Sequence, residues 1–183
     1  LAGEIYDPVR LDEKHREMLR TGLFQNFRIN QVAQPDNTVR LDITVEEAKP
    51  KEFAASLGFS SYQGLIVDAR ITNRNLYGTG RSLSLEIEHS LRSLGAEVLY
   101  LDPWFMESDF NLRARLYLQT REEEGYTKQE GGSRFDLTRK VTKNIELGAF
   151  FQLKNVEIKE TAIDPIYLGP TAYQIATLGY TQL

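Results

Sequence analysis

The chain has 183 residues, of which 41% are hydrophobic, with a mean hydropathy of −0.40 and a net charge of −4. No run of about 18 apolar residues occurs, which excludes a transmembrane helix but not a transmembrane β-barrel, because half of a barrel strand's residues are polar. The pI of about 5.3 and the lack of a basic stripe interleaved with aromatic residues argue against nucleic acid as a partner. The absence of cysteine removes disulfides, thiol catalysis and thiolate metal sites.

The first 48 residues predict a small α+β module. Asp7-Pro8 is typical of a helix start, with aspartate as N-cap and proline at the first helical position. Apolar residues then recur at helical spacing until a glycine ends the helix. Two strands are predicted at 27–32 and 39–45, around a turn at 34–37 that contains proline and an Asp/Asn pair. This module is one predicted domain, and residues 51–183 are the second.

The second domain alternates apolar and polar residues almost without error. The alternation runs through 65–72 and 82–91, which flank a turn at Gly78-Thr79-Gly80, and it returns at 53–60, 110–119 and 145–153. Because successive side chains of a strand point to opposite faces, each segment has one apolar and one polar face. Each is close to the roughly 9 to 11 residues that a tilted strand needs to cross a bilayer. We therefore predict a mainly β protein, an antiparallel transmembrane β-barrel of about eight strands.

The alternation assigns side chains to two surfaces of the predicted barrel, because apolar faces opposite charged ones fit lipid outside and a polar lumen inside. The residues predicted to face lipid are Leu83, Leu85, Ile87, Leu112, Leu116 and Leu118, and those predicted to face the lumen are Glu86, Glu88, Arg113 and Arg115. We expect the charged residues to form salt bridges with one another. Tyr77, Tyr100, Trp104 and Phe105 lie near strand ends, and we interpret them as an interfacial aromatic girdle rather than a ligand pocket.

No catalytic or metal-binding constellation is present in the sequence. His15 and His89 have no second His or Cys at metal spacing, so both are assigned surface or packing roles. The acidic run 122–124, beside Gly125 and Gly131-Gly132, is interpreted as a solvated loop. There is no Gly-x-Ser-x-Gly motif and no glycine-rich phosphate loop, so we expect neither enzyme activity nor a cofactor.

Several motifs follow one another in the order and spacing of a known family. They are Asp7-Pro8 before a helix, Leu19-Arg20-Thr21-Gly22-Leu23-Phe24 at its end, the strand Val39 to Glu47, the turns Asn75 to Arg81 and Asp102 to Phe105, and Phe135 to Thr142 followed by Ile145 to Phe151. Together they resemble a final POTRA repeat joined to the barrel of the outer-membrane assembly-factor superfamily. That superfamily includes the insertases of the barrel assembly machinery, their translocation-and-assembly relatives and the two-partner secretion transporters.

The chain departs from the family pattern in two respects. Only residues 1–6 precede the helix, so the first POTRA strand is expected to be clipped or short, and no Arg-Gly-Phe or Arg-Gly-Tyr tripeptide marks the family's inward-folded loop. The family's barrel also has about twice as many strands as we predict here. The resemblance therefore implies an N-terminal barrel fragment with open edges at 53–60 and 173–183. These edges are expected to pair with the missing half in nature, and with a second copy or each other in the isolated chain.

The resemblance implies an outer-membrane insertase or translocator whose N-terminal module lies in the periplasm. Its expected partners are outer-membrane lipid, unfolded outer-membrane or secreted client proteins and other assembly subunits. A two-partner secretion transporter and a passive porin-like or structural barrel remain alternatives. A soluble β-rich binding domain is a further alternative, and it requires a second sheet to cover the apolar faces. The N-terminal module argues against the passive barrel, and detergent-dependent solubility would argue against the soluble domain.

Two strands are predicted to carry the function. The first barrel strand is rich in small residues and glycine, which weaken a strand, so we expect it to be the gate at a seam where a client strand pairs. The strand at the edge of the α+β module is expected to capture the client by β-addition. The gate residues are Phe53, Ala54, Ala55, Ser56, Leu57, Gly58 and Phe59, and the docking-edge residues are Phe27, Arg28, Ile29, Asn30, Gln31 and Val32. Ordinary sheet structure without either role is the alternative.

Overall fold

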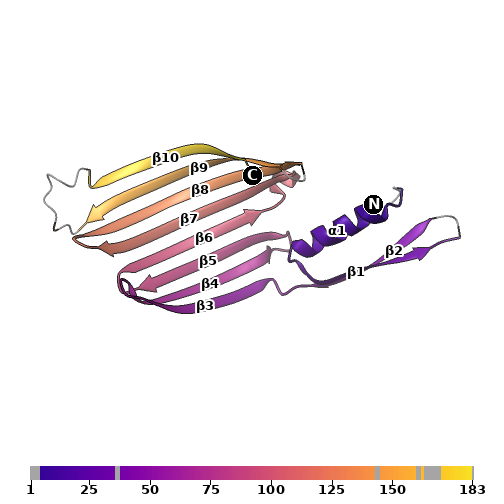
Figure 1. The fold of residues 1–183 in the computed structure, drawn as a ribbon, viewed down its shortest axis with the longest axis horizontal. Coiled ribbons are helices and arrows are strands. Elements are labelled where there is room, and N and C mark those ends of the chain that lie inside the picture. Colours follow the sequence, from indigo (N-terminus) through magenta and orange to yellow (C-terminus); the bar gives the residue numbers. More distant parts are fainter. Residues whose placement is uncertain (1–4, 36–37, 143–144, 160–161, 163–169, 183) are drawn as a thin grey trace. The chain divides into compact units, whose positions relative to one another are not determined.

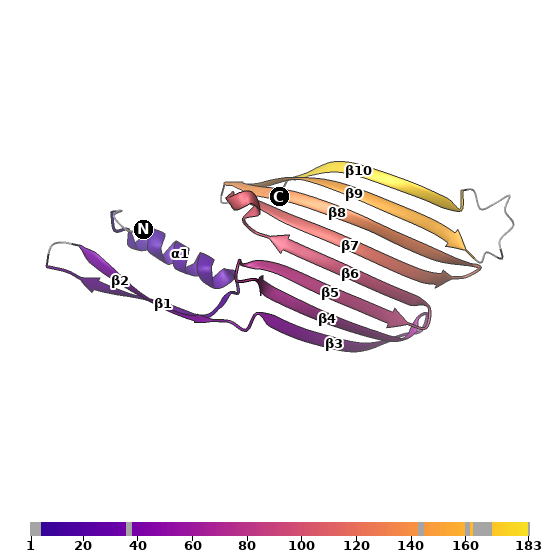
Figure 2. The same cartoon turned by 180° about the vertical axis from the view of Figure 1, so that it is seen from behind.

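The computed structural model describes residues 5–35, 38–142, 145–159, 162 and 170–182, and the chain divides into two compact units, Leu1–Pro50 and Lys51–Leu183. The first unit contains one helix and a two-stranded sheet, and the second contains an eight-stranded antiparallel sheet (Figures 1 and 2). None of the helices in the described part of the chain could span a membrane.

The first unit is built from helix α1 (Pro8–Arg20) and strands β1 (Phe24–Ala33) and β2 (Val39–Glu47), which pair antiparallel. The Asp7 carboxylate accepts a hydrogen bond from the Val9 backbone N–H at 2.9 Å, so it is the predicted N-cap. Helix α1 packs against β1, where Leu11 and Phe27 are only 5% and 8% exposed. Strand β1 begins at Phe24, three residues before the start predicted at residue 27. Part of the turn predicted at 34–37 lies outside the described residues.

The second unit is an up-and-down sheet in which each strand pairs antiparallel with its sequence neighbour, in the order β10-β9-β8-β7-β6-β5-β4-β3. The strands are β3 (Lys51–Ser60), β4 (Gly64–Leu76), β5 (Arg81–Ser90), β6 (Ser93–Asp102), β7 (Phe110–Glu123), β8 (Tyr126–Thr142), β9 (Ile145–Lys159) and β10 (Ala172–Gln182), with the 3₁₀ helix η1 (Phe105–Glu107) before β7. Eight antiparallel strands confirm the predicted fold class. The motif turns Asn75 to Arg81 and Asp102 to Phe105 follow β4 and β6 as expected.

Cross-strand register brings the predicted lipid-facing residues onto one face of this sheet. Residues directly opposite one another in an antiparallel pair project to the same side. On that side Leu83, Leu85 and Ile87 lie opposite Tyr100, Val98 and Ala96, which lie opposite Ala114, Leu116 and Leu118. Glu86 lies opposite Glu97 on the other side. The sheet therefore has one apolar and one charged face.

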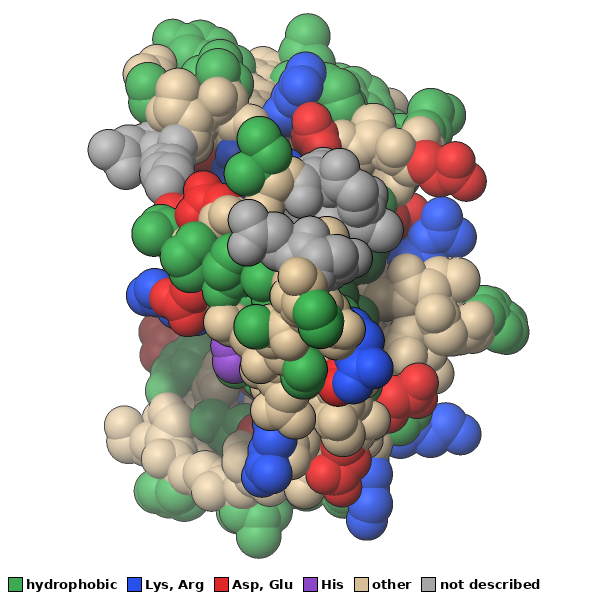
Figure 3. All heavy atoms as spheres, turned by 90° about the vertical axis from the view of Figure 1, so that its right-hand side faces the viewer, with side chains coloured by type: hydrophobic (Ala, Val, Ile, Leu, Met, Phe, Trp, Pro, Cys, Tyr) green, Lys and Arg blue, Asp and Glu red, His purple; other side chains and the backbone are tan. Residues whose placement is uncertain are grey.

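The apolar face is not covered within the described part of the chain. Leu85 and Leu118 are 42% and 69% exposed, and hydrophobic side chains reach the surface of the molecule (Figure 3). Val156 is the one hydrophobic residue of the sheet that is buried among those described. A soluble sandwich would need a second sheet on this face, and the strands described here form one layer only.

The loop expected around the acidic run is largely wrong. Glu122 and Glu123 complete β7, and only Glu124 and Gly125 form the turn to β8. The pair Gly131-Gly132 lies in the middle of β8, where Tyr117 and Leu118 of β7 crowd the space that Cβ atoms would fill. These glycines make room for neighbouring side chains and do not mark a loop.

The strands β3 and β10 stand at opposite ends of the sheet order and do not pair with each other. Self-closure, one of the two expectations for the isolated chain, is therefore wrong. An eight-stranded barrel has an interior only wide enough for its own side chains, and the charged face carries long side chains, including Arg70, Glu86, Glu97 and Arg115. Pairing between copies stays a prediction.

Candidate functional site

The predicted gate strand β3 is an edge strand, which pairs on one side only among the described strands. Its register with β4 runs from Lys51 opposite Asn73 to Ser60 opposite Gly64. Every residue of β3 except Ser60 is exposed, and Phe53, Leu57 and Phe59 are 70%, 76% and 81% exposed on the apolar face. An edge of this kind presents a row of backbone donors and acceptors to any strand that can pair with it.

Few side-chain contacts hold β3 to its neighbour. In the part of the chain that the structure describes, Ser56 donates a hydrogen bond to Asp68, and Arg74 donates to Glu52 at 2.8 Å. A Cβ placed on Gly58 would meet no atom nearer than the Cβ of Ile66, at 3.9 Å. The strand therefore depends mainly on its backbone ladder to β4, as the composition of small residues predicted.

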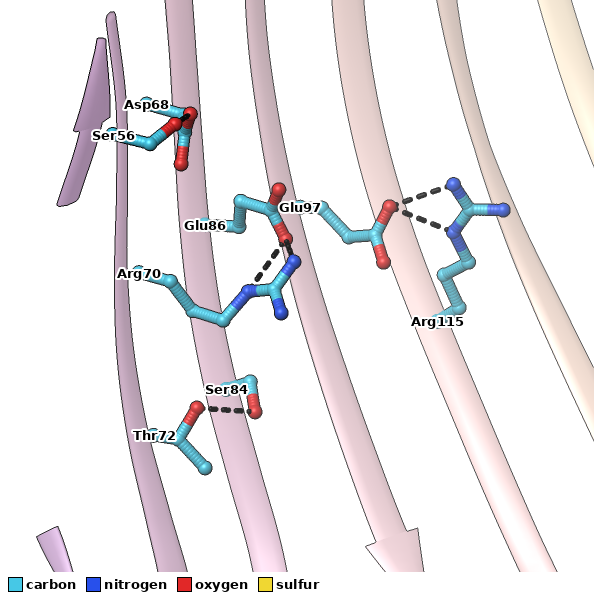
Figure 4. A network of polar contacts seen from close by, with 8 residues as sticks. All are labelled: Ser56, Asp68, Arg70, Thr72, Ser84, Glu86, Glu97 and Arg115. Carbon is cyan, nitrogen blue, oxygen red and sulfur yellow. Dashed lines mark hydrogen bonds and ion pairs between the residues drawn. The ribbon is translucent and has the colours of Figure 1, made fainter. Parts of the chain in front are cut away.

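The interior strands are tied across the charged face by ion pairs (Figure 4). Arg70 of β4 donates through Nε to Glu86 Oε2 of β5 at 2.9 Å. Arg115 of β7 donates through Nε and Nη2 to Glu97 Oε2 of β6 at 2.8 and 2.6 Å. The Thr72 and Ser84 hydroxyls add a further contact between β4 and β5 at 3.0 Å.

The expected partners of these charges were wrong. Glu86 pairs with Arg70, and Arg115 pairs with Glu97, because β6 separates the strands that carry Glu86 and Arg115. Glu88 lies opposite Asp68 and Gly95, and Arg113 lies opposite Leu101 and Asp136, so all four predicted lumen residues share the charged face. That this face lines a lumen stays a prediction.

The predicted girdle aromatics gather at the sheet end that carries the two motif turns. Tyr77 lies in the β4–β5 turn, Trp104 in the β6–β7 connection and Phe105 in η1, while Tyr100 lies on the apolar face two residues before the end of β6. Tyr77 and Trp104 are 92% and 47% exposed. Their depth in a membrane stays a prediction.

A buried carboxylate connects the two motif turns at this end. Asp102, which is 4% exposed, accepts a hydrogen bond from the Trp104 backbone N–H at 3.1 Å and pairs with Arg81 Nε at 2.9 Å. Arg81 closes the β4–β5 turn, in which Gly78 and Gly80 adopt positive φ angles of 74° and 72°. The family-like turn motifs therefore act together, since one supplies the cation that compensates the buried carboxylate of the other.

At the opposite end of the sheet, three turns meet at Tyr62, which follows β3. Its hydroxyl donates to Glu123 Oε2 of β7 at 2.9 Å, and the Arg92 guanidinium lies 4.8 Å from its ring centroid. The hydrogen bond to Glu123, with some desolvation, raises the pKa of Tyr62 above its ordinary value. Leu91 N–H also donates to the Gln63 carbonyl at 3.2 Å. This end of β3 is thus fixed to the interior of the sheet.

The predicted docking edge lies in the first unit, where β1 pairs with β2 on one side only. The register is continuous from Asn26 opposite Glu46 to Ala33 opposite Val39, with one irregularity between Phe24 and Asn26. The six residues named for this edge, from Phe27 to Val32, all lie within β1. Capture of a client at this edge stays a prediction.

An antiparallel up-and-down sheet with one apolar and one charged face is the arrangement expected of the wall of a membrane β-barrel. A family described as the Omp85 superfamily domain matches residues 75–169, which is more than half of the chain. The chain belongs to the Omp85 superfamily.

The chain is also similar to individual members of that family. It is 26% identical over 114 residues to the outer membrane protein assembly factor BamA of Neisseria meningitidis serogroup B, covering 61% of this chain and 14% of that protein. A crystal structure of BamA from Haemophilus ducreyi lacking POTRA domains 1–3 matches with a TM-score of 0.68 and 16% identity, over 93% of this chain and 36% of that one. The second likeness is one of fold, and the chain spans a minor part of both relatives.

Proposed function

We propose that this chain forms part of an outer-membrane insertase, in which β1 captures unfolded client proteins in the periplasm and β3 templates their strands at a barrel seam. Membership of the Omp85 superfamily supports the membrane location and the general role, and the relatives' names describe assembly of outer-membrane proteins. The first unit is proposed to be a POTRA module. No catalytic chemistry or cofactor forms part of this function.

The exposed edge of β3 is the observation that carries the proposal. In hydrocarbon, each unpaired backbone group costs several kcal/mol, so an edge strand of a membrane sheet must find a partner. An incoming client strand supplies that partner, and the pairing is reversible where the edge strand contributes little side-chain packing. β3 meets this condition, since it is exposed almost throughout and Gly58 leaves open space.

Cysteine cross-linking tests the seam, because the chain contains no native cysteine. Ala55 of β3 and Ala96 of β6 lie in one cross-strand row and project to the same face, so Ala55→Cys and Ala96→Cys differ chiefly in whether the strand is an edge. Each variant is placed in lipid vesicles with a denatured outer-membrane protein that carries single cysteines in successive strands. We expect disulfides to the client from position 55 and not from position 96.

A third variant separates the proposal from translocation through the lumen. Leu99 lies on the charged face of β6, opposite Ser84 and Arg115. Client disulfides from Leu99→Cys in place of Ala55→Cys would favour a two-partner secretion transporter and contradict the seam. An absence of disulfides from all three positions would contradict both roles and favour a passive barrel.

Proline substitution tests capture at the first unit. Ile29 of β1 and Ile43 of β2 lie directly opposite each other. Proline removes the backbone donor at its position, so Ile29→Pro and Ile43→Pro remove matched donors on the two strands. We expect Ile29→Pro to abolish client cross-links from β1 while the unit stays folded by circular dichroism, and Ile43→Pro to leave them unchanged. Undiminished cross-linking in folded Ile29→Pro protein would show that capture does not use this edge.

A further inference from the structure

Within the part of the chain that the structure describes, the outer edge of β1 is open along only part of its length. The Gln34 N–H donates to the Thr38 carbonyl at 2.9 Å, which continues the register in which Ala33 lies opposite Val39. Residues that lie opposite each other in two antiparallel strands alternate between two kinds of pair. In one kind the two residues exchange backbone hydrogen bonds, and in the next their N–H and C=O groups point away from the partner strand. Phe27, Ile29, Gln31 and Ala33 therefore direct their N–H and C=O groups away from β2.

A side chain of helix α1 already forms a hydrogen bond with one of these outward groups. His15 Nε2 lies 2.7 Å from the Phe27 carbonyl oxygen, and the two rings are 5.5 Å apart between centroids. A carbonyl can only accept, so Nε2 donates, and this contact independently shows that the Phe27 carbonyl points away from β2. Further along β1, the Tyr6 hydroxyl donates to the Gln31 side chain at 2.6 Å. This contact does not use the backbone N–H and C=O groups of Gln31.

We propose that His15 sets the register of the captured client by closing the docking edge at Phe27. A client strand that paired beyond Ile29 would bring a backbone N–H to a carbonyl already taken and would meet the imidazole ring. The strand is therefore confined to the outward groups of Ile29, Gln31 and Ala33, whose spacing of two residues matches that of an extended chain. The occupant is an extended, unfolded client segment, and this inference rests on the capture proposed for β1.

Two cross-linking positions measure the register in the full chain. Asn26 and Asn30 occupy equivalent positions, because each lies next to residues whose backbone groups point away from β2. Asn26 flanks the closed end of the edge, and Asn30 flanks the open part. A peptide from an outer-membrane protein strand, carrying a photoreactive group, is the probe for Asn26→Cys and Asn30→Cys. In the otherwise unchanged chain we expect cross-links from position 30 and not from position 26.

Substitution of His15 provides the decisive comparison. His15→Ala removes both the ring and the donor at Phe27, whereas His15→Gln keeps a donor. We expect His15→Ala to produce cross-links from position 26 and to tighten peptide binding about 2- to 10-fold, the gain of one backbone hydrogen bond. His15→Gln should restore the original pattern, and His89→Ala, on β5 of the second unit, should change nothing.

The outcomes separate this inference from the capture on which it rests. Cross-links from position 26 in the unsubstituted chain, or an unchanged pattern in His15→Ala, would overturn the role of His15 and leave capture at β1 intact. An absence of cross-links from both positions in every variant would overturn capture itself, and the register inference with it.

Discussion

Gly58 in β3 and Gly132 in β8 show how differently one residue type serves an edge strand and an interior strand. A Cβ at Gly58 would meet nothing within 3.9 Å, whereas a Cβ at Gly132 would lie 2.5 Å from the Leu153 carbonyl oxygen and 2.9 Å from the Tyr117 hydroxyl. The interior glycine lets an aromatic side chain and a neighbouring strand approach closely. The edge glycine leaves unfilled space.

This difference indicates a gradient of local stability across the sheet. β8 pairs on both sides and carries the Arg134–Asp136 ion pair at 2.7 Å, whereas β3 pairs on one side and is exposed almost throughout. Segments with few packed contacts open at lower free-energy cost than segments in a packed interior. The strand proposed to exchange partners is therefore held less firmly than the interior strands, except where Tyr62 fixes its far end.

Edge and interior strands share the apolar face that we predict to meet lipid, and a lysine on that face gives the largest expected effect. Leu85→Lys, near the middle of β5, should lower the free energy of unfolding in lipid by about 2 to 4 kcal/mol. Ser84→Lys projects to the charged face and should cost less. Urea unfolding of both variants in vesicles provides the measurement, and equal stabilities would contradict the lipid-face assignment.

A pair of alanine substitutions tests the glycine comparison directly. Gly132→Ala forces a Cβ against a backbone oxygen and should destabilise the sheet by about 1 to 3 kcal/mol. Gly58→Ala fits without a clash and should stabilise β3 by up to about 1 kcal/mol, because glycine loses more conformational freedom on folding. Urea unfolding in vesicles measures both. A similar loss of stability at both positions would show that the edge is packed as tightly as the interior.

The ion pairs of the charged face should contribute less than packing does. Arg70 and Glu86 have side chains that are 54% and 33% exposed, so a double-mutant cycle of Arg70→Met and Glu86→Gln should give a coupling free energy of about 0.2 to 1 kcal/mol. Increasing salt should weaken it. A coupling above about 2 kcal/mol, beyond the range for exposed pairs, would mean that charge and not packing distinguishes the interior from the edge.

The smallest effect concerns the fixed end of β3 at high pH. The raised pKa of Tyr62 means that its protonated form is favoured by folding, so the contribution is complete below the unfolded pKa of about 10 and is lost as pH rises through the higher folded value. Hydrogen exchange of the β3 amides should accelerate over that range. Tyr62→Phe removes the titrating group, so the exchange rate of the β3 amides in that variant should not show this transition. A transition that persists in Tyr62→Phe would show that another group causes it.

Local patterns in the sequence predict most of the elements and their faces. Alternation with a period of two identified the strands at 82–91 and 110–119, and Asp7-Pro8 identified the start of α1. These signals are local, because the pleat of a strand and the orphan donors of a helix N-terminus depend on a few consecutive residues. β6 was not recognised as a strand, since Leu99 and Leu101 place apolar side chains on its charged face as well.

Contacts between residues distant in the chain follow from strand order, register and packing. Glu97 is the partner of Arg115 because β6 lies between β5 and β7, and Gly131-Gly132 lies within β8 because Tyr117 and Leu118 fill the space above it. His15 reaches the Phe27 carbonyl because α1 packs on β1. Each contact depends on register or packing between segments distant in the chain, and a pattern of period two is unchanged when a neighbouring strand shifts by two residues.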